Sequence, residues 1–327
     1  MTRLYERLEQ EFGAWAGVSN VVACSSGGAA LHLAIEALQL PRGSRVIVPE
    51  FTMIACARAV ILASLEPVFV DCSDDLLLNV DLLKDHPPKK VKAIMPVHVY
   101  GRQCNMDRIH DLAEKYGWAV IEDLAEAHGI DPDLRSNAAC WSFYRNKIIA
   151  GEEGGAVAFK EQKHADLARK LRCYGQTIAN DCSYVPRGWN YRMTDALAKP
   201  ILESLKNADV NLRLRKQVAT WYDELIPAEW KMPSRDVDWV YDLRIPGLTI
   251  ERQDRIIAQL KQSGVEARHG FKPLSHQREY RGKNHRTLNA AKLSREVLYL
   301  PINSEMTQDE VCRNAGALLT AAAPGPT

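Results

Sequence analysis

Short apolar runs alternate with helix-length segments between residues 20 and 160, and this alternation is the strongest constraint on the fold. Most of the runs are continuous and rich in β-branched residues, which is typical of strands covered on both faces. The runs are NVVAC (20–24), RVIVP (45–49), PVFVD (67–71), KAIMPV (92–97), WAVIED (118–123), ACWSF (139–143) and GAVAF (155–159). Apolar-periodic segments at 29–39, 53–64 and 105–116 are long enough for crossover helices. The pattern predicts an α/β fold, a mostly parallel mixed sheet flanked by helices.

The sequence changes in character after this region. Helices are expected over 162–174 and 193–224, the second one long and charged on one face. Beyond Pro227 the sequence suggests a smaller α+β domain, whose expected elements are WVYDLRI (239–245), a helix near 251–263, VEARHGF (265–271) and a helix near 307–321. A chain of 327 residues fits about two domains, and we expect a large domain over 1–215 and a small one over 216–327.

Composition excludes several classes of protein. Lys plus Arg is 42 and Asp plus Glu is 41, so the net charge of +1 does not suit a general nucleic-acid binder. The hydrophobic content of 46% suits a packed core rather than a disordered chain. Apolar stretches such as 59–65 are too short to cross a bilayer, and the charged first residues lack the apolar core of a signal peptide. We therefore expect a cytoplasmic protein without nucleic-acid or membrane partners.

The eight cysteines are scattered along the chain. None forms a C-x-x-C pair or a Cys/His spacing typical of zinc ligands, so no metal site is expected. We interpret them as reduced structural thiols.

Three segments carry possible chemistry at predicted strand ends. In CSSGGAALHLAIEAL (24–38) small and glycine residues join a strand to a helix, which suits an anion site at the helix N-terminus, although it is neither a Walker A loop nor a dinucleotide fingerprint. A tight turn without a ligand is the alternative.

In WAVIEDLAEAHG (118–129) Glu122 and Asp123 end a parallel strand, where open α/β sheets bind ligands. Asp123 could instead cap the next helix, and Glu126 and His128 could be surface residues.

The third segment, CWSFYRNKIIAGEEGGAVAF (140–159), places Ser142 and Lys147 between a strand and a glycine-bearing turn. Most lysines are solvated surface charges, but this one is expected at the ligand edge of the sheet. A phosphate anchor, a carboxylate and an amine at one sheet edge are the groups that pyridoxal 5′-phosphate requires. The phosphate suits the helix N-terminus, the aldehyde a lysine, and the ring nitrogen an acid.

Several segments in collinear order resemble the sugar aminotransferases of the DegT/DnrJ/EryC1/StrS family. They are SSGGAALHLA, RVIVPEFTMIACARAV, EPVFVD, KAIMPVHVYG, VIEDLAEAHG, WSFYRNKIIAGEEGG, NYRMTDALA and VEARHGFKPLSHQ, which cover nearly the whole chain. These proteins are fold-type I pyridoxal-phosphate enzymes, so the resemblance implies an aspartate-aminotransferase-like large domain that binds the cofactor.

The resemblance also implies roles for individual residues. Lys147 matches the catalytic lysine that forms the Schiff base with the cofactor. The matching cofactor-binding positions are Asp123 for the pyridinium nitrogen, Glu126 beside the ring hydroxyl, Met53 on the ring face, Ser26, Gly27, Gly28 and Ser142 around the phosphate, and Asn190 for the neighbouring subunit's phosphate. Asn190 thus implies a homodimer with shared active sites. Positions near the sugar or its diphosphate are His98, Tyr100, Arg192, Arg268 and Lys272, each of which could also be a core or surface residue.

The chain departs from the family pattern in five places. Many relatives have Thr at Gly28, an aromatic at Met53 and Gln at Glu126. They also have a longer segment between His128 and Cys140, and residues ahead of the helix expected from about Leu4. The last two differences leave the identity of the substrate open.

The expected activity is a ping-pong transfer of an amino group from an amino acid, with glutamate the usual donor, to a keto-sugar linked to a nucleotide. Lys147 would act as general base and acid. One alternative is a pyridoxal-phosphate enzyme with a cyclitol or other non-nucleotide keto acceptor. Others are a weakly active or regulatory cofactor-binding homologue and, more remotely, a nucleotide-binding dehydrogenase.

Overall fold

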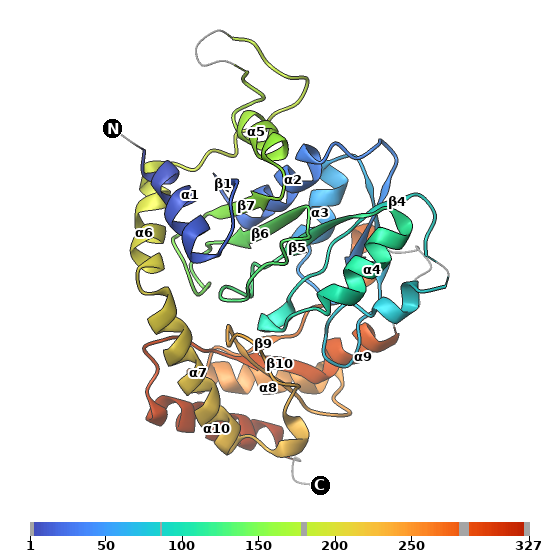
Figure 1. The fold of residues 1–327 in the computed structure, drawn as a ribbon. Helices are drawn as coiled ribbons and strands as arrows, with labels where there is room; N and C mark the ends of the chain where they lie inside the picture. Colours follow the sequence, from blue (N-terminus) through green and yellow to red (C-terminus); the bar gives the residue numbers. More distant parts are fainter. Residues whose placement is uncertain (1–2, 86, 178–181, 281–287, 324–327) are drawn as a thin grey trace.

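Seven strands form one sheet in the order β1-β7-β6-β5-β4-β2-β3 (Figure 1). The computed structural model describes residues 3–85, 87–177, 182–280 and 288–323. The strands are β1 (Val21–Cys24), β2 (Arg45–Pro49), β3 (Glu66–Val70), β4 (Val91–Ile94), β5 (Ala119–Asp123), β6 (Ala138–Ser142) and β7 (Gly155–Phe159). Only the pairs that include β7 are antiparallel in this sheet, and the others are parallel. Each of the seven apolar runs forms one strand, so the predicted mostly parallel mixed sheet is confirmed.

Helices cover the sheet and bury their apolar faces against it. They are α1 (Leu4–Trp15), α2 (Gly27–Ala37), α3 (Ala55–Leu62), α4 (Met106–Tyr116) and α5 (Gln162–Leu171). Helix α2 is buried along most of its length, because it packs on β6 and β7 and also against α3 and α5. Helix α4 buries one face only; the Asn105 side chain caps its first turn, and Gly117 ends it with a φ of 67°.

The expected long helix over 193–224 is wrong in one respect, because it is two helices. They are α6 (Asp195–Leu205) and α7 (Ala208–Leu225), separated at Lys206 and Asn207. Asn207 leaves the helical conformation at φ −105° and ψ 8°, and its side-chain amide donates back to the Glu203 carbonyl of α6 at 3.5 Å. Helix α7 then runs from the large sheet to the C-terminal part of the molecule (Figure 1).

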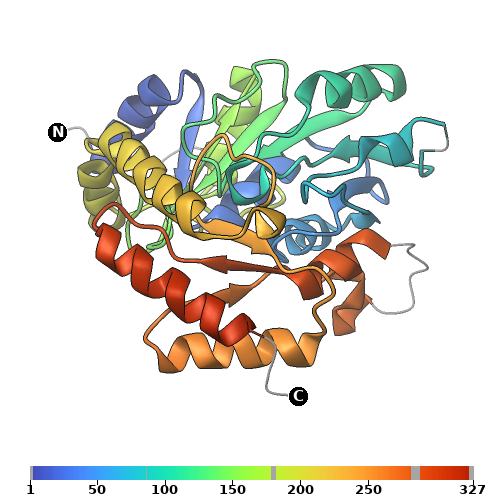
Figure 2. The same cartoon turned by 90° about the horizontal axis from the view of Figure 1, so that it is seen from below.

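The C-terminal part is built on a second sheet of three antiparallel strands in the order β8-β10-β9. Its elements are β8 (Tyr241–Arg244), α8 (Ile250–Gln262), β9 (Arg268–His269), α9 (Leu288–Glu296), β10 (Val297–Leu300) and α10 (Gln308–Ala322). Helix α10 packs against both α7 and α8, as Figure 2 shows from below. Helix α9 and strand β10 were not predicted from the sequence, and the strand expected over 265–271 is only two residues long. A second apolar core, which includes Val218, Tyr222, Leu298 and Leu318, holds this part together.

The boundary between the two predicted domains, 1–215 and 216–327, remains a prediction. Residues beyond it contribute to both cores, since Val240, Leu274 and Leu293 pack into the core of the large sheet.

The eight cysteines all lie within the described ranges and are free thiols. Among the described residues, none of the helices combines the length and the apolar character needed to span a bilayer.

A buried ion pair ties the two sheets together. The Arg102 guanidinium lies 2.8 Å from the Asp242 carboxylate on β8, and both side chains are almost completely buried. Arg102 also donates to the Pro233 carbonyl at 2.8 Å, and Arg235 donates to Asp242 at 2.9 Å. Two buried guanidinium groups therefore share the carboxylate of Asp242, and Arg235 also donates to the Asp238 carboxylate at 2.9 Å.

We expect Asp242→Ala to lower the free energy of unfolding by about 3–5 kcal/mol, because it leaves the buried Arg102 guanidinium without its carboxylate partner. Urea denaturation followed by circular dichroism measures this loss. The control is Glu11→Ala, which removes the partner of Arg7 at the surface and should cost no more than about 1 kcal/mol. Equal losses for the two variants would contradict the role assigned to Asp242.

Candidate active site

A cavity of about 440 Å³ lies between the large sheet and the second sheet, within the size range of small-ligand sites. Its lining from the large sheet follows strands β1, β2, β5 and β6 at their carboxyl ends, where ligands bind in open α/β sheets. Its lining from the C-terminal part includes Trp239, Arg268, Phe271 and Tyr299. Of the predicted site residues, those lining this cavity are Ser26, Gly27, Gly28, Met53, Asp123, Glu126, Ser142, Lys147 and Arg268.

The start of α2 forms one wall. The Ser26 hydroxyl caps the helix by accepting the Ala29 N–H at 3.1 Å, and the first turn contains no acidic residue. Gly27 is required by close approach, since a Cβ there would lie 2.7 Å from the Cβ of Ser142. At Gly28 a Cβ would meet only the Ser26 hydroxyl, at 3.9 Å. Backbone N–H groups at a helix start, with the Ser142 hydroxyl beside them, fit an anionic group such as a phosphate.

Asp123 is the last residue of β5, and its carboxylate is held by two donors. Oδ1 accepts the Ala125 N–H at 2.9 Å, and Oδ2 accepts the Cys56 thiol at 3.1 Å. No helix begins between Asp123 and β6, because turns lead from β5 directly to β6. The alternative that Asp123 caps a helix is therefore wrong. The orientation of the carboxylate suits a partner inside the cavity.

Lys147 lies in the connection between β6 and β7, and its side chain is 11% exposed. Its Nζ atom lies 3.8 Å from the centre of the Trp239 ring and 3.9 Å from Glu126 Oε1. Burial lowers the pKa of Lys147, while the charges of Glu126 and Asp123 raise it. The alternative that Lys147 is a solvated surface charge is thus wrong. A desolvated amine of this kind is a competent nucleophile.

Glu126 is buried beside Lys147. Its Oε2 atom accepts the backbone N–H of Tyr100 at 3.0 Å. Burial raises the pKa of Glu126 to about 7, against the opposing effects of the Lys147 charge and the Tyr100 N–H. His128 is equally buried and accepts the Ile149 N–H at Nδ1, at 3.1 Å. Burial lowers the pKa of His128 to about 3, so it is a neutral core residue.

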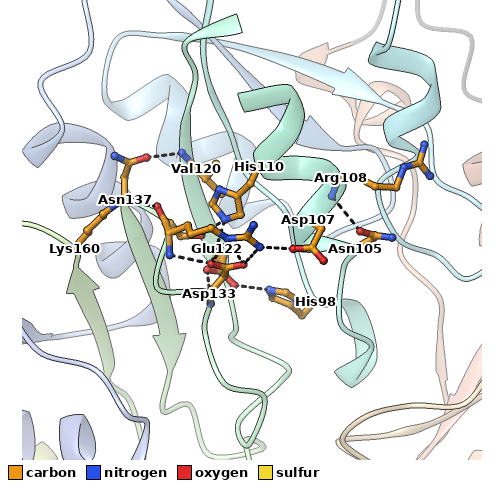
Figure 3. A network of polar contacts seen from close by, with 12 residues as sticks. His98, Asn105, Asp107, Arg108, His110, Val120, Glu122, Asp133, Asn137 and Lys160 are labelled. Atoms are coloured by element: carbon orange, nitrogen blue, oxygen red, sulfur yellow. Dashed lines mark hydrogen bonds and ion pairs between the residues drawn. The ribbon is translucent and has the colours of Figure 1, made fainter. Parts of the chain in front are cut away.

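His98 does not line the cavity. Its Nδ1 atom accepts the Cys104 N–H at 3.1 Å, so Nε2 donates to the Glu122 carboxylate at 3.2 Å (Figure 3). Glu122 also accepts the Asp133 N–H, at 3.0 Å. Both ring nitrogens are engaged in a fully buried network, which favours the core-residue alternative for His98 over substrate contact.

The other predicted substrate positions are divided. The Tyr100 ring is fully buried and stacks on Phe271, outside the cavity lining. Arg268 lines the cavity and is ion-paired with Glu266 at 2.5 Å. Asn190, Arg192 and Lys272 are exposed and lie outside the lining of the cavity in this chain.

Two residues that shape the site were not predicted from the sequence. Cys56 follows β2 and reaches Asp123 from the start of α3. Trp239 precedes β8, and its indole N–H donates to the Asn146 carbonyl at 2.8 Å, next to Lys147. Trp239 belongs to an apolar run that suggested only a strand, and Cys56 to one that suggested only a helix. Their positions depend on tertiary contacts that local patterns do not contain.

Comparison with known proteins gives a consistent result. The model of the DegT/DnrJ/EryC1/StrS aminotransferase family matches residues 2–318. GDP-perosamine synthase of Caulobacter vibrioides is 33% identical over 97% of this chain and 89% of its own length. The dTDP-3-amino-3,4,6-trideoxy-alpha-D-glucose transaminase of Micromonospora megalomicea is 32% identical over 78% of this chain and 71% of its own length. Among solved structures, S. venezuelae DesV in complex with a ketimine intermediate has a TM-score of 0.88 at 27% identity, covering 99% of this chain and 91% of its own.

The two glycines at the start of α2 give a matched test of the anion site. Gly27→Ala should weaken the binding of pyridoxal 5′-phosphate about tenfold or more, because relieving the overlap with Ser142 costs about 1–3 kcal/mol in a packed site. Gly28→Ala should leave binding nearly unchanged, since its Cβ enters open space. Titration of the intrinsic tryptophan fluorescence measures both affinities. Equal affinities for the two variants would place the phosphate elsewhere.

Proposed function

The chain belongs to the DegT/DnrJ/EryC1/StrS aminotransferase family, and we propose that it transfers an amino group from an amino acid to a keto-sugar carried on a nucleotide. It is an aminotransferase whose cofactor is pyridoxal 5′-phosphate. We take glutamate as the expected donor. The two relatives support a nucleotide-linked acceptor, because one is named as a GDP-perosamine synthase and the other as a dTDP-sugar transaminase.

The observation that carries this proposal is one cavity that contains a buried amine, an oriented carboxylate and a helix N-terminus. The residues present fit the cofactor. Ser26, Gly27 and Gly28 would hold the phosphate together with Ser142, and Asp123 would hold the ring nitrogen. When bound, the cofactor supplies an aldehyde that bonds to amines and a ring that accepts an electron pair.

Lys147 performs the proton transfers in this proposal. Its Nζ atom is desolvated and lies within the cavity, so it can bond as a neutral amine and, once free, accept and return a proton. Trp239 packs against this amine and is itself 5% exposed, which keeps water from one side of it. The carboxylate of Asp123 keeps its orientation through the Cys56 thiol and the Ala125 N–H.

A homodimer with shared active sites is part of the proposal. Asn190 and Arg192 are exposed and do not reach the cavity of their own chain, which leaves them available to a second copy.

Met53 is a position at which the chain differs from the family pattern. It is 51% exposed and lines the cavity, so a flexible thioether occupies the position beside the cofactor face. The cytoplasmic location remains a prediction.

Lys147→Ala should abolish the visible absorbance of the purified, cofactor-loaded protein, because no other amine is expected to bond to the aldehyde. Absorbance spectra before and after addition of the cofactor measure this. The control is Lys272→Ala, which removes an exposed lysine outside the cavity lining and should keep the band. A visible band that persists in Lys147→Ala would mean that a different lysine holds the cofactor.

Addition of glutamate should convert the cofactor to its amine form and remove the visible band, since the first half of an amino transfer needs only the donor. A nucleotide-linked keto-sugar should then restore the band faster than a keto-cyclitol. Stopped-flow absorbance follows both halves. Absence of any change with a panel of amino acids would favour the regulatory alternative, and equal rates for the two acceptors would favour the non-nucleotide one.

A further inference from the structure

The carboxyl group of Glu126 and the amine of Lys147 face each other in the active-site cavity. Glu126 Oε1 lies 3.9 Å from Lys147 Nζ, and the two side chains are 7% and 11% exposed. We propose that Glu126 is a positioning residue that sets the protonation state of Lys147: its carboxylate holds the proton on Nζ, and its neutral form lets that proton go. The inference rests on the proposed function for the role of Lys147 alone.

The orientation of Glu126 is fixed by the backbone of Tyr100. Oε2 accepts the Tyr100 N–H at 3.0 Å, which leaves Oε1 toward Lys147. Tyr100 adopts a left-handed conformation with φ 53°, uncommon for a residue other than glycine. Its ring packs against Phe271 and Phe51, with ring centres 5.3 and 6.2 Å away, and these two rings also contact each other, at 5.6 Å. A residue with a strained backbone, whose ring is fixed in an aromatic cluster, thus aims one donor at Glu126.

The groups that act on Glu126 come from six segments around the cavity. They are Lys147 from the β6–β7 connection, Asp123 at the end of β5, Cys56 on α3, Tyr100 in the turn at 99–101, Asp242 on β8 and Tyr299 on β10. Lys147 favours the charged carboxylate, whereas Asp123 and Asp242 oppose it. Burial opposes the charge most strongly and raises the pKa of Glu126 to about 7. Glu126 therefore changes its charge near neutral pH.

The effect on Lys147 has a definite sign. Above about pH 7 the Glu126 carboxylate is charged and raises the pKa of Lys147, which keeps more of the amine protonated. An opposite charge within about 4–6 Å typically shifts a pKa by about 1–3 units. In Glu126→Gln the amide can still accept the Tyr100 N–H but is neutral at every pH. Lys147 in this variant should lose its proton at a lower pH.

The test measures the reactivity of Lys147 in the full-length chain without cofactor. The protein is treated briefly with acetic anhydride over a range of pH, and acetylation at Nζ is quantified by peptide mass spectrometry. Only the neutral amine reacts, so the midpoint of the profile reports its protonation. In Glu126→Gln the midpoint should fall by at least about one pH unit relative to the wild type. A structural role for Glu126 would change the amount of folded protein but not this midpoint.

Glu153→Gln is the matched control, because it neutralises an exposed carboxylate that lines the same cavity, and it should leave the midpoint unchanged. Glu126→Asp keeps the charge on a shorter side chain and should give an intermediate midpoint. It serves as the test variant if Glu126→Gln does not fold, as judged by circular dichroism. Coincident midpoints for the wild type and the folded Glu126 variant would overturn the inference.

The labelling experiment does not depend on amino transfer. If Glu126→Gln shifts the midpoint while glutamate leaves the holoenzyme spectrum unchanged, the proposed function fails and the coupling of Glu126 to Lys147 stands. If glutamate converts the cofactor while the midpoint does not move, the reverse holds.

Discussion

The common direction of six strands in the large sheet is the constraint on which the rest of the molecule depends. Because β7 alone runs opposite to its neighbours, the loops that follow β1, β2, β5 and β6 meet at one edge. Ser26, Asp123 and Lys147 are far apart in the sequence and reach one cavity by this means. The reversed strand adds a steric condition. A Cβ at Gly155, the first residue of β7, would lie 2.3 Å from the Ser26 carbonyl oxygen, so the turn before α2 rests directly on it.

The second sheet completes the cavity. The segment that leads into this sheet is fixed to the large domain by close backbone contacts. Gly101, with φ 81°, allows the backbone of Val237 to approach so closely that a Cβ would lie 1.9 Å from its carbonyl oxygen. The N–H groups of Asp236 and Val237 donate to the Gly101 carbonyl, each at 3.0 Å. The segment anchored there continues to Trp239, which packs on Lys147. Because Gly101 directly follows Tyr100, the same turn aims a donor at Glu126 and anchors the segment that covers Lys147.

Local patterns in the sequence were sufficient for the sheet and for the residues at its edge. Strands buried on both faces need continuous apolar runs, and polar residues such as Asp123 that end them lie where ligands bind. The break between α6 and α7 was not predicted, because Asn207 interrupts a pattern that is amphipathic on both sides. Cys56 and Trp239 were not predicted either, since their roles arise from contacts across 67 residues to Asp123 and 93 residues to Asn146. His98 illustrates the opposite limit: its position suggested substrate contact, and only the geometry revealed its two buried partners.

Desolvation affects the two ionisable groups of the cavity in opposite directions. It penalises the charged form of each, so it raises the pKa of Glu126 and lowers the pKa of Lys147. In water an ammonium group holds its proton far more tightly than a carboxyl group does. Transfer of a proton from the ammonium group to the carboxylate is therefore strongly unfavourable. Burial narrows the difference between the pKa values of Glu126 and Lys147, while the distance of 3.9 Å between the two groups keeps their charges coupled. The alternation between a neutral and a protonated amine that we propose for Lys147 is favoured by such a partner, because burial moves the pKa values of both groups toward neutral pH.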